Sequence, residues 1–276
     1  MQSATAPALA WMDGDVVPLA EATLPLADDG VLRGDAVFEA MLVRQGRTHA
    51  RRRHLDRLQR SADALDLDLD TARVRTCLAD LLAAYGAQDG SVRVIVTRGG
   101  TVRGLIGPVA WPPSLTLGVV EMPWRTALSG VKTLSYAANQ WAVRQARARG
   151  ADDALVVDAD RVLELPTGAL VLVRDGRCTT PDPGRLPILD SVTVHVLREV
   201  VEVTPGLPTL AELAEADELF VVSATRPGLP VHRVLLPDDA SRDLTTPGPV
   251  TAAVQERLQA HISATLDAPI RVAGDT

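Results

Sequence analysis

Two kinds of repeat run through the apolar positions of this chain, one with the period of a strand and one with that of a helix. Leu55, Leu58, Ala62 and Leu65 recur at the spacing of a single helix face. The pattern predicts strands at 9–12, 16–19, the last part of 32–43, 48–50, 92–98, 115–121, 153–158, 170–173 and 218–223, and helices at 54–65, 71–85, 139–149, 191–201 and 250–266. Because strands and helices alternate throughout, we expect an α+β fold with mixed α/β character.

The length of the chain, 276 residues, suits one large domain or two smaller ones. A Met-Pro-Trp step at 122–124 follows the predicted strand 115–121 and interrupts the periodic pattern. We therefore predict an N-terminal α/β domain at 1–121, a linker at 122–126 and a C-terminal domain at 127–276.

Composition and charge exclude several classes of function. The hydrophobic fraction of 46% is that of a globular protein and is too high for a disordered chain. A net charge of -7 gives no general attraction to phosphate backbones, so we expect no nucleic-acid partner. No apolar run is long enough to span a bilayer, and the first residues lack the basic start and apolar stretch of a signal peptide. We expect a cytoplasmic protein with no membrane partner.

Several common kinds of site are not indicated by the sequence. Cys77 and Cys178 form no CxxC pair, which argues against a disulfide scaffold or a zinc ribbon. The five histidines show no pair at metal-binding spacing, so we expect no metal. The sequence also contains no GxxxxGK[ST], GxGxxG or GxSxG motif.

The basic residues are almost all of one kind. Of the 28 lysines and arginines, only Lys132 is a lysine, which leaves 27 arginines. A genome rich in arginine codons would produce this bias, because a solvated lysine can drift to arginine at little cost. A lysine should survive where its amine must lose a proton and act as a nucleophile, which a guanidinium cannot do. The alternative is a chance survivor on the surface.

The neighbourhood of Lys132 fits a reactive amine. It is flanked by Val131 and Thr133 just before a predicted helix, and apolar surroundings disfavour the ammonium form. An amine of this kind suits a Schiff base with pyridoxal phosphate. That cofactor would further require a carboxylate for its ring nitrogen, donors for its phosphate and an anchor for the substrate carboxylate.

Five segments carry a resemblance that covers roughly residues 13–233. They are RGDAVFE at 33–39, HLDRL at 54–58, KTLSY at 132–136, RVLE at 161–164 and TTP at 179–181. These segments resemble the class IV, fold-type IV pyridoxal-phosphate enzymes, which include branched-chain and D-amino-acid aminotransferases and 4-amino-4-deoxychorismate lyase. The resemblance implies a homodimer of two-domain chains, each with a small N-terminal α/β domain and a larger C-terminal domain with a barrel-like sheet.

The resemblance also implies roles for individual residues. Lys132 would hold the cofactor as a Schiff base and transfer protons, Glu164 would pair with the pyridine nitrogen, and Arg57 would bind the phosphate. Further cofactor contacts are implied for Tyr136, Val192, Thr193, Ser223 and Thr225, and substrate contacts for Phe38 and Arg98. Arg103, beside the same glycine turn as Arg98, is an alternative anchor for the substrate carboxylate.

The chain departs from the family pattern at three places. Ala169 stands where an asparagine is usual, and Ser-Val-Thr-Val at 191–194 replaces the usual Gly-Ile-Thr-Arg phosphate motif. Ala224 occupies the position of a phosphate-binding threonine, so Ser223 or Thr225 must take over that contact. These losses leave open a degenerate member of the family that binds without catalysis.

The motifs favour an aminodeoxychorismate lyase that forms 4-aminobenzoate and pyruvate. KTLSYAxN followed by a Gly-Ala-Asp-Asp step at 150–153 resembles chains of that subgroup. RGDAVFE fits both subgroups, so an aminotransferase acting on branched-chain or D-amino acids with a 2-oxo acid is the alternative. In both cases the partner is a small amino substrate.

Overall fold

The computed structural model describes residues 8–237 and 240–270, and the chain divides into two compact units. Unit 1 comprises the residues up to Ala110, the short segment Val131–Ser135 and the residues from Ile262 onward. Unit 2 comprises Trp111–Gly130 and Tyr136–His261. The segment that contains Lys132 therefore belongs to the first unit, although most of its chain neighbours belong to the second.

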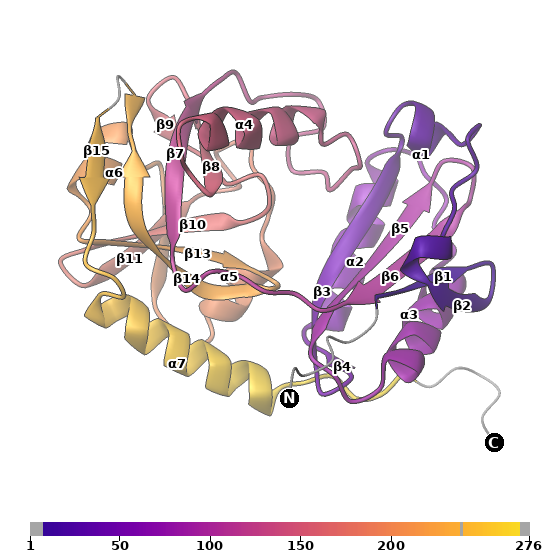
Figure 1. The fold of residues 1–276 in the computed structure, drawn as a ribbon. Helices are drawn as coiled ribbons and strands as arrows, with labels where there is room; N and C mark the ends of the chain where they lie inside the picture. The colour runs from indigo at the N-terminus through magenta and orange to yellow at the C-terminus, as the bar shows by residue number, and fades with distance from the viewer. Residues whose placement is uncertain (1–7, 238–239, 271–276) are drawn as a thin grey trace. The chain divides into compact units, whose positions relative to one another are not determined.

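Unit 1 is a six-stranded antiparallel sheet with two long helices (Figure 1). The strand order is β2-β1-β6-β5-β3-β4. The elements are β1 (Leu9–Met12), β2 (Asp15–Pro18), the 3-10 turn η1 (Leu19–Glu21), α1 (Asp29–Leu32), β3 (Ala36–Arg44), β4 (Arg47–Thr48), α2 (Arg51–Asp63), α3 (Thr71–Tyr85), β5 (Gly90–Thr97) and β6 (Val102–Gly107).

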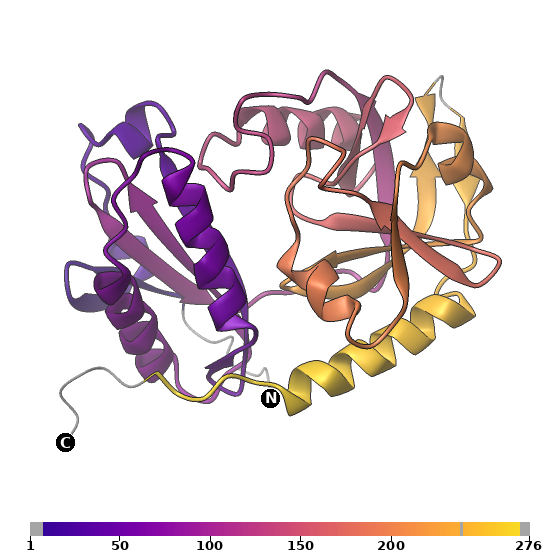
Figure 2. The same cartoon turned by 180° about the vertical axis from the view of Figure 1, so that it is seen from behind.

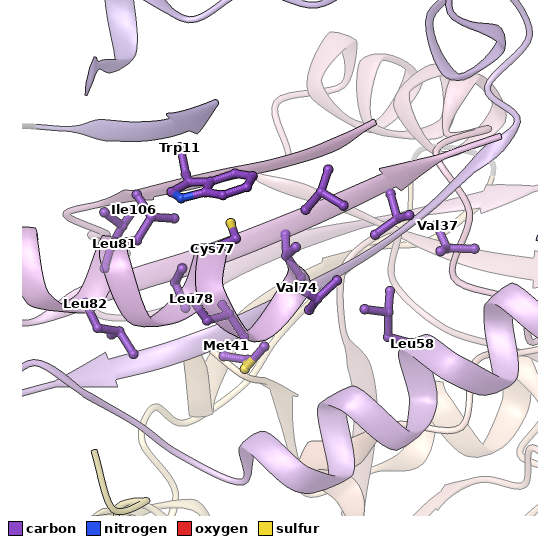
Figure 3. Close-up of a cluster of buried hydrophobic side chains, with 14 of the residues drawn as sticks. Trp11, Val37, Met41, Leu58, Val74, Cys77, Leu78, Leu81, Leu82 and Ile106 are labelled. Carbon is purple, nitrogen blue, oxygen red and sulfur yellow. The ribbon is translucent and has the colours of Figure 1, made fainter. Parts of the chain in front are cut away.

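The core of unit 1 lies between this sheet and the helices α2 and α3 (Figure 3). Alternate residues of β3 point to the same side, and Val37 and Met41 are fully buried against Leu58 of α2 and Leu78 of α3. The close approach of α3 depends on Gly104 in β6, where an added Cβ would lie 2.4 Å from a cysteine sulfur of that helix. Phe38 lies on the opposite face of β3, away from this core.

The start of α2 is held by the C-terminal segment of the chain. Ala50, the N-cap residue, supplies no side-chain hydrogen bond. Instead the Arg51 amide donates to Asp267 Oδ2 at 2.9 Å, and the side chain of Arg47 donates to the carbonyls of Leu266 and Asp267. A carboxylate at this end also complements the helix dipole.

Unit 2 is built on a curled nine-stranded sheet (Figures 1 and 2). The strand order is β12-β11-β10-β13-β14-β7-β8-β9, and β15 pairs with β14. The elements are β7 (Leu115–Glu121), α4 (Ala137–Ala148), β8 (Asp153–Asp158), β9 (Arg161–Val162), β10 (Ala169–Arg174), β11 (Arg177–Pro181), α5 (Val192–Leu197), β12 (Val203–Gly206), α6 (Leu210–Glu215), β13 (Glu218–Ser223), β14 (Arg226–Leu235), β15 (Ser241–Asp243) and α7 (Pro249–Ala264).

The strand pairing of β7 differs from the sequence-based expectation. We placed residues 115–121 before the linker and so in the N-terminal domain, but β7 pairs in parallel with β8 and β14 in the second sheet. The physical reason is the composition of the strand: its first six residues are all buried, as in a central strand with neighbours on both edges. Residues 122–126, the expected linker, follow β7 inside unit 2.

Periodicity predicted most of the helices and strands, and it did not predict η1, α1, β6, β9, β11, β12, α6, β14 or β15. The helix at 71–85 agrees with α3 at both ends, whereas α5 is shorter than the predicted helix at 191–201. Pro227, Gly228 and Pro230 interrupt the pattern of β14. The pairing of β14 with β13 shifts between Val221 and Val222, where Gly228 has no partner in the register. Among the described residues, no helix is both long and apolar enough to cross a membrane.

Candidate active site

Lys132 is fixed by its backbone alongside strand β3. The Phe38 amide donates to the carbonyl of Lys132 at 3.1 Å, and the Leu134 amide donates to the carbonyl of Ala36 at 2.9 Å. The Lys132 amide in turn donates to Ser61 Oγ of α2 at 3.1 Å. The backbone N–H and C=O of Lys132 are thus both hydrogen-bonded, so the Cα from which its side chain extends is held in place.

The amine of Lys132 lies against an aromatic ring. Its Nζ is 4.5 Å from the centroid of the Phe38 ring, and Phe38 is only 4% exposed. The guanidinium carbon of Arg93 is 4.9 Å from the same centroid. Cations favour aromatic faces at these distances. Phe38 was predicted as a substrate contact, and the structure places it against the predicted catalytic lysine.

Arg93 is a residue that the sequence reasoning missed. It lies on β5, where it is paired with Ala40 of β3, two residues along from Phe38. Alternation along β5 therefore puts Arg93 on the side of the sheet that faces away from the helices and toward the Phe38 ring. The strand period could have located it, but only once the register of β3 and β5 was known.

Arg57 is part of a buried cluster of charged and polar groups. Its Nε and Nη2 donate to Glu39 Oε1 and Oε2 at 2.6 and 2.9 Å, which makes the pair bidentate. His54 Nδ1 lies 2.7 Å from Oε2 of the same carboxylate. Glu39 is fully buried, and Arg57 and His54 are nearly so. The predicted phosphate residue is therefore held in one orientation by Glu39.

The charge state of Glu39 follows from these neighbours. Burial alone would raise the pKa of this carboxyl, but the positive charge of Arg57 and the hydrogen bonds from His54 and Arg57 outweigh it and lower the pKa from 4.5 to about 2. Glu39 is therefore ionised in the folded protein at neutral pH. The ion pair with Arg57 is preserved down to strongly acidic conditions.

Arg98, the predicted substrate anchor, has other partners. Its Nε and Nη2 donate to the Asp35 carboxylate at 3.0 and 3.2 Å, and its Nη atoms also donate to the carbonyls of Leu65 and Asp66. These contacts tie the end of β5 to the loop after α2. The alternative, Arg103, pairs with Asp13. The arginine whose guanidinium lies over the Phe38 ring is Arg93.

Glu164 is oriented by two donors in unit 2. Trp124 Nε1 donates to its Oε1 at 3.3 Å, and the Leu189 amide donates to its Oε2 at 3.2 Å. Its own carbonyl accepts a hydrogen bond from Val156 of β8, which fixes the backbone directly after β9. A half-buried carboxylate with both oxygens oriented is suited to accept a hydrogen bond from a protonated heterocyclic nitrogen.

The remaining predicted cofactor residues also lie in unit 2. Val192 and Thr193 are buried in the first turn of α5, which follows Leu189 by a few residues and contacts β13. Ser223 ends β13, and Thr225 lies in the turn that leads to β14. Tyr136 is the N-cap residue of α4, and its contact with the cofactor stays a prediction. Among the described residues, no group of three or more His, Cys, Asp or Glu is arranged to hold a metal ion.

The donors present fit pyridoxal phosphate by their chemistry. Lys132 would supply a primary amine for the aldehyde, Glu164 an oriented carboxylate for the pyridine nitrogen, and Arg57 a fixed guanidinium for the phosphate. Hydroxyl donors are present on Thr193, Ser223 and Thr225, as described above. Each group that the cofactor requires has a counterpart in the chain.

Comparison with protein families decides the relationship. The family model for amino-transferase class IV matches residues 36–234, which is most of the chain. This chain belongs to the class IV aminotransferase family. The resemblance inferred from the motifs is thereby confirmed, and so are the activity as a pyridoxal-phosphate-dependent enzyme and the cofactor.

Two groups of curated relatives of this class IV enzyme differ in activity. A bifunctional aminodeoxychorismate lyase / D-amino acid transaminase of Mycobacterium tuberculosis is 30% identical over 80% of this chain and 89% of its own length. A D-alanine aminotransferase of Listeria monocytogenes is 27% identical over 89% of this chain and 93% of its own. Both similarities cover at least 80% of this chain and of the relative.

Solved structures confirm the fold class. The pyridoxal-phosphate-bound form of a hypothetical aminotransferase from Mycobacterium tuberculosis matches with a TM-score of 0.82 at 28% identity, over 93% of this chain and 99% of that one. A fold IV transaminase from Curtobacterium pusillum matches with a TM-score of 0.81 at 25% identity, over the same shares. The expected α+β fold with a curled, barrel-like sheet is thus confirmed.

The Glu39–Arg57 pair predicts a pH-dependent loss of stability. Substitution Glu39→Gln leaves the Arg57 charge uncompensated in a buried place, so we expect a loss of about 3–5 kcal/mol in unfolding free energy at pH 7. Because the pKa of Glu39 is about 2 when folded and 4.5 when exposed, the stabilisation is complete above 4.5 and is lost as the pH falls toward 2.

Urea unfolding of both proteins between pH 2 and 7 measures this effect. The difference between wild type and Glu39→Gln should shrink steadily below pH 4.5. Glu256→Gln, at an exposed position of α7, is the matched control and should keep the wild-type pH dependence. An equal dependence on pH in wild type and Glu39→Gln would show that the pair is not ionised as described.

Proposed function

We propose that this class IV enzyme is an aminodeoxychorismate lyase, which converts aminodeoxychorismate into 4-aminobenzoate and pyruvate. The observation that carries the proposal is the amine of Lys132, the only lysine, held at the Phe38 ring. It is supported by the similarity to the bifunctional lyase and transaminase of Mycobacterium tuberculosis. Transamination of D-amino acids is the second candidate, because the Listeria D-alanine aminotransferases cover more of this chain.

The chain's own groups divide the chemical work. Pyridoxal phosphate, when bound, supplies a ring that accepts electron density from the carbon next to the substrate nitrogen. Lys132 would hold the cofactor through its amine, and the same amine would move a proton at the substrate carbon. Glu164 keeps the ring nitrogen protonated, and Trp124 and Leu189 hold that carboxylate in position. Arg57, fixed by Glu39, receives the phosphate.

The substrate carboxylate is assigned to Arg93 in this proposal. Its guanidinium carbon lies 4.9 Å and the Lys132 amine 4.5 Å from the centroid of the Phe38 ring, so the two cationic groups share one aromatic ring. Arg98, which the motif suggested, holds Asp35 and two backbone carbonyls. A homodimer and a cytoplasmic location stay predictions from the sequence.

Product analysis separates the two candidate activities. Purified enzyme is incubated with aminodeoxychorismate and, separately, with D-alanine and 2-oxoglutarate. Pyruvate from either reaction is detected with lactate dehydrogenase, and 4-aminobenzoate is detected by its fluorescence. We expect 4-aminobenzoate and pyruvate in equal amounts from the first mixture, and no turnover by Lys132→Arg. Turnover of D-alanine alone would replace the lyase assignment with that of a D-amino-acid aminotransferase.

Replacement of Arg93 tests the assignment of the carboxylate anchor. The loss of a charged hydrogen bond to the substrate should raise KM in Arg93→Gln by about 10- to 100-fold, with a smaller change in kcat. Arg98→Gln is the matched variant and should change KM little, because its contacts are within the protein. The reverse order of the two effects on KM would return the anchor to Arg98.

A further inference from the structure

Arg226 is a buried guanidinium with partners in three other segments of unit 2. It is 1% exposed and begins β14. Its Nη1 donates to Asp153 Oδ2 at 2.9 Å, and its Nη2 donates to the carbonyl and the hydroxyl of Thr167, both at 2.6 Å. Its Nε donates to Ser223 Oγ at 3.2 Å. A buried charge with this many partners fixes the positions of all of them.

Trp111 completes the arrangement from the exposed side. The guanidinium carbon of Arg226 lies 4.6 Å from the centroid of a Trp111 ring, within the range of a cation–π contact. The indole Nε1 of Trp111 donates to Thr225 Oγ1 at 3.3 Å. The two hydroxyls on either side of Ala224 therefore each receive a hydrogen bond from a fixed donor.

This use of the two hydroxyls determines what they can still do. A hydroxyl has one O–H to donate and two lone pairs to accept. Ser223 Oγ and Thr225 Oγ1 each accept one hydrogen bond through a lone pair. Among the described residues, no acceptor takes the proton of either hydroxyl, and both side chains are half-buried. Each hydroxyl therefore has a proton to donate to an anion.

We propose that Trp111 and Arg226 are positioning residues that aim the hydroxyl protons of Thr225 and Ser223 at the phosphate of the cofactor. The inference rests on the proposed function, which places pyridoxal phosphate in this enzyme. It accounts for Ala224, which occupies the position of a phosphate-binding threonine in the family pattern. Two oriented hydroxyls at 223 and 225 replace the single one that is absent at 224.

The experiment compares two probes that differ only in the phosphate. Full-length apoenzyme is titrated with pyridoxal phosphate and with pyridoxal by equilibrium dialysis, which needs no turnover. Trp111→Phe keeps the ring over Arg226 and removes the indole N–H. We expect it to weaken pyridoxal phosphate about three- to tenfold and to leave pyridoxal binding unchanged. Trp141→Phe, at an equally exposed tryptophan of α4 (43% exposed in both cases), should change neither.

A double-mutant cycle shows whether Trp111 acts through Thr225. Thr225→Val should weaken pyridoxal phosphate, and Trp111→Phe should then have no further effect. Arg226→Gln should weaken the same probe, and circular dichroism checks its folding; the tryptophan variants decide the proposal if this variant does not fold. The proposal is overturned if Trp111→Phe leaves the affinity for pyridoxal phosphate unchanged, weakens both probes equally, or adds to Thr225→Val.

If the proposed function is wrong, the wild-type protein itself gives a different binding result in this experiment. A wild-type protein that binds neither probe would contradict the cofactor role of Lys132 itself. Wild-type binding of both probes with equal affinity would show that no residue of the chain uses the phosphate. Tight wild-type binding of pyridoxal phosphate together with unaffected Trp111 variants contradicts only the positioning role.

Discussion

The structure depends on a short piece of backbone, the pairing of Val131–Ser135 with strand β3. Hydrogen bonds from Phe38 and to Ser61 hold the peptide groups of Lys132 on both sides, and the amine then lies on the Phe38 ring. Peptide groups held in this way stay in place, so the side chain that carries the reactive nitrogen extends from a fixed stretch of backbone. The segment belongs to the compact unit of β3, although its neighbours along the chain do not.

Buried arginines paired with carboxylates are the second theme. Arg57 is held by Glu39, and Arg226 is held by Asp153, with all four side chains nearly or fully buried. In each pair the carboxylate compensates the positive charge and fixes the orientation of the guanidinium. Removal of one partner would leave the other charge buried and unpaired. The arginine bias of the composition thus provides fixed guanidiniums inside both units as well as solvated charge on the surface.

The sequence was informative where the signal is local and uninformative where it depends on packing. Periodicity located α3 at both ends, and the arginine bias singled out Lys132 before any motif was considered. Arg93 and Arg226 could not be found in this way, because 27 arginines look alike until strand register and burial distinguish them. The roles of Arg57 and Glu164 came from family resemblance, and their partners Glu39, Trp124 and Leu189 became known only from the fold.

Chemical trapping tests the central claim most directly. Purified protein saturated with pyridoxal phosphate is treated with sodium borohydride, which reduces a carbon–nitrogen double bond to a stable single bond, and is then digested for peptide mass spectrometry. A pyridoxyl group on Lys132 is the expected result, with no label in Lys132→Arg. A label on another residue, or the same label in the arginine variant, would contradict the assignment of this amine as the group that binds the cofactor.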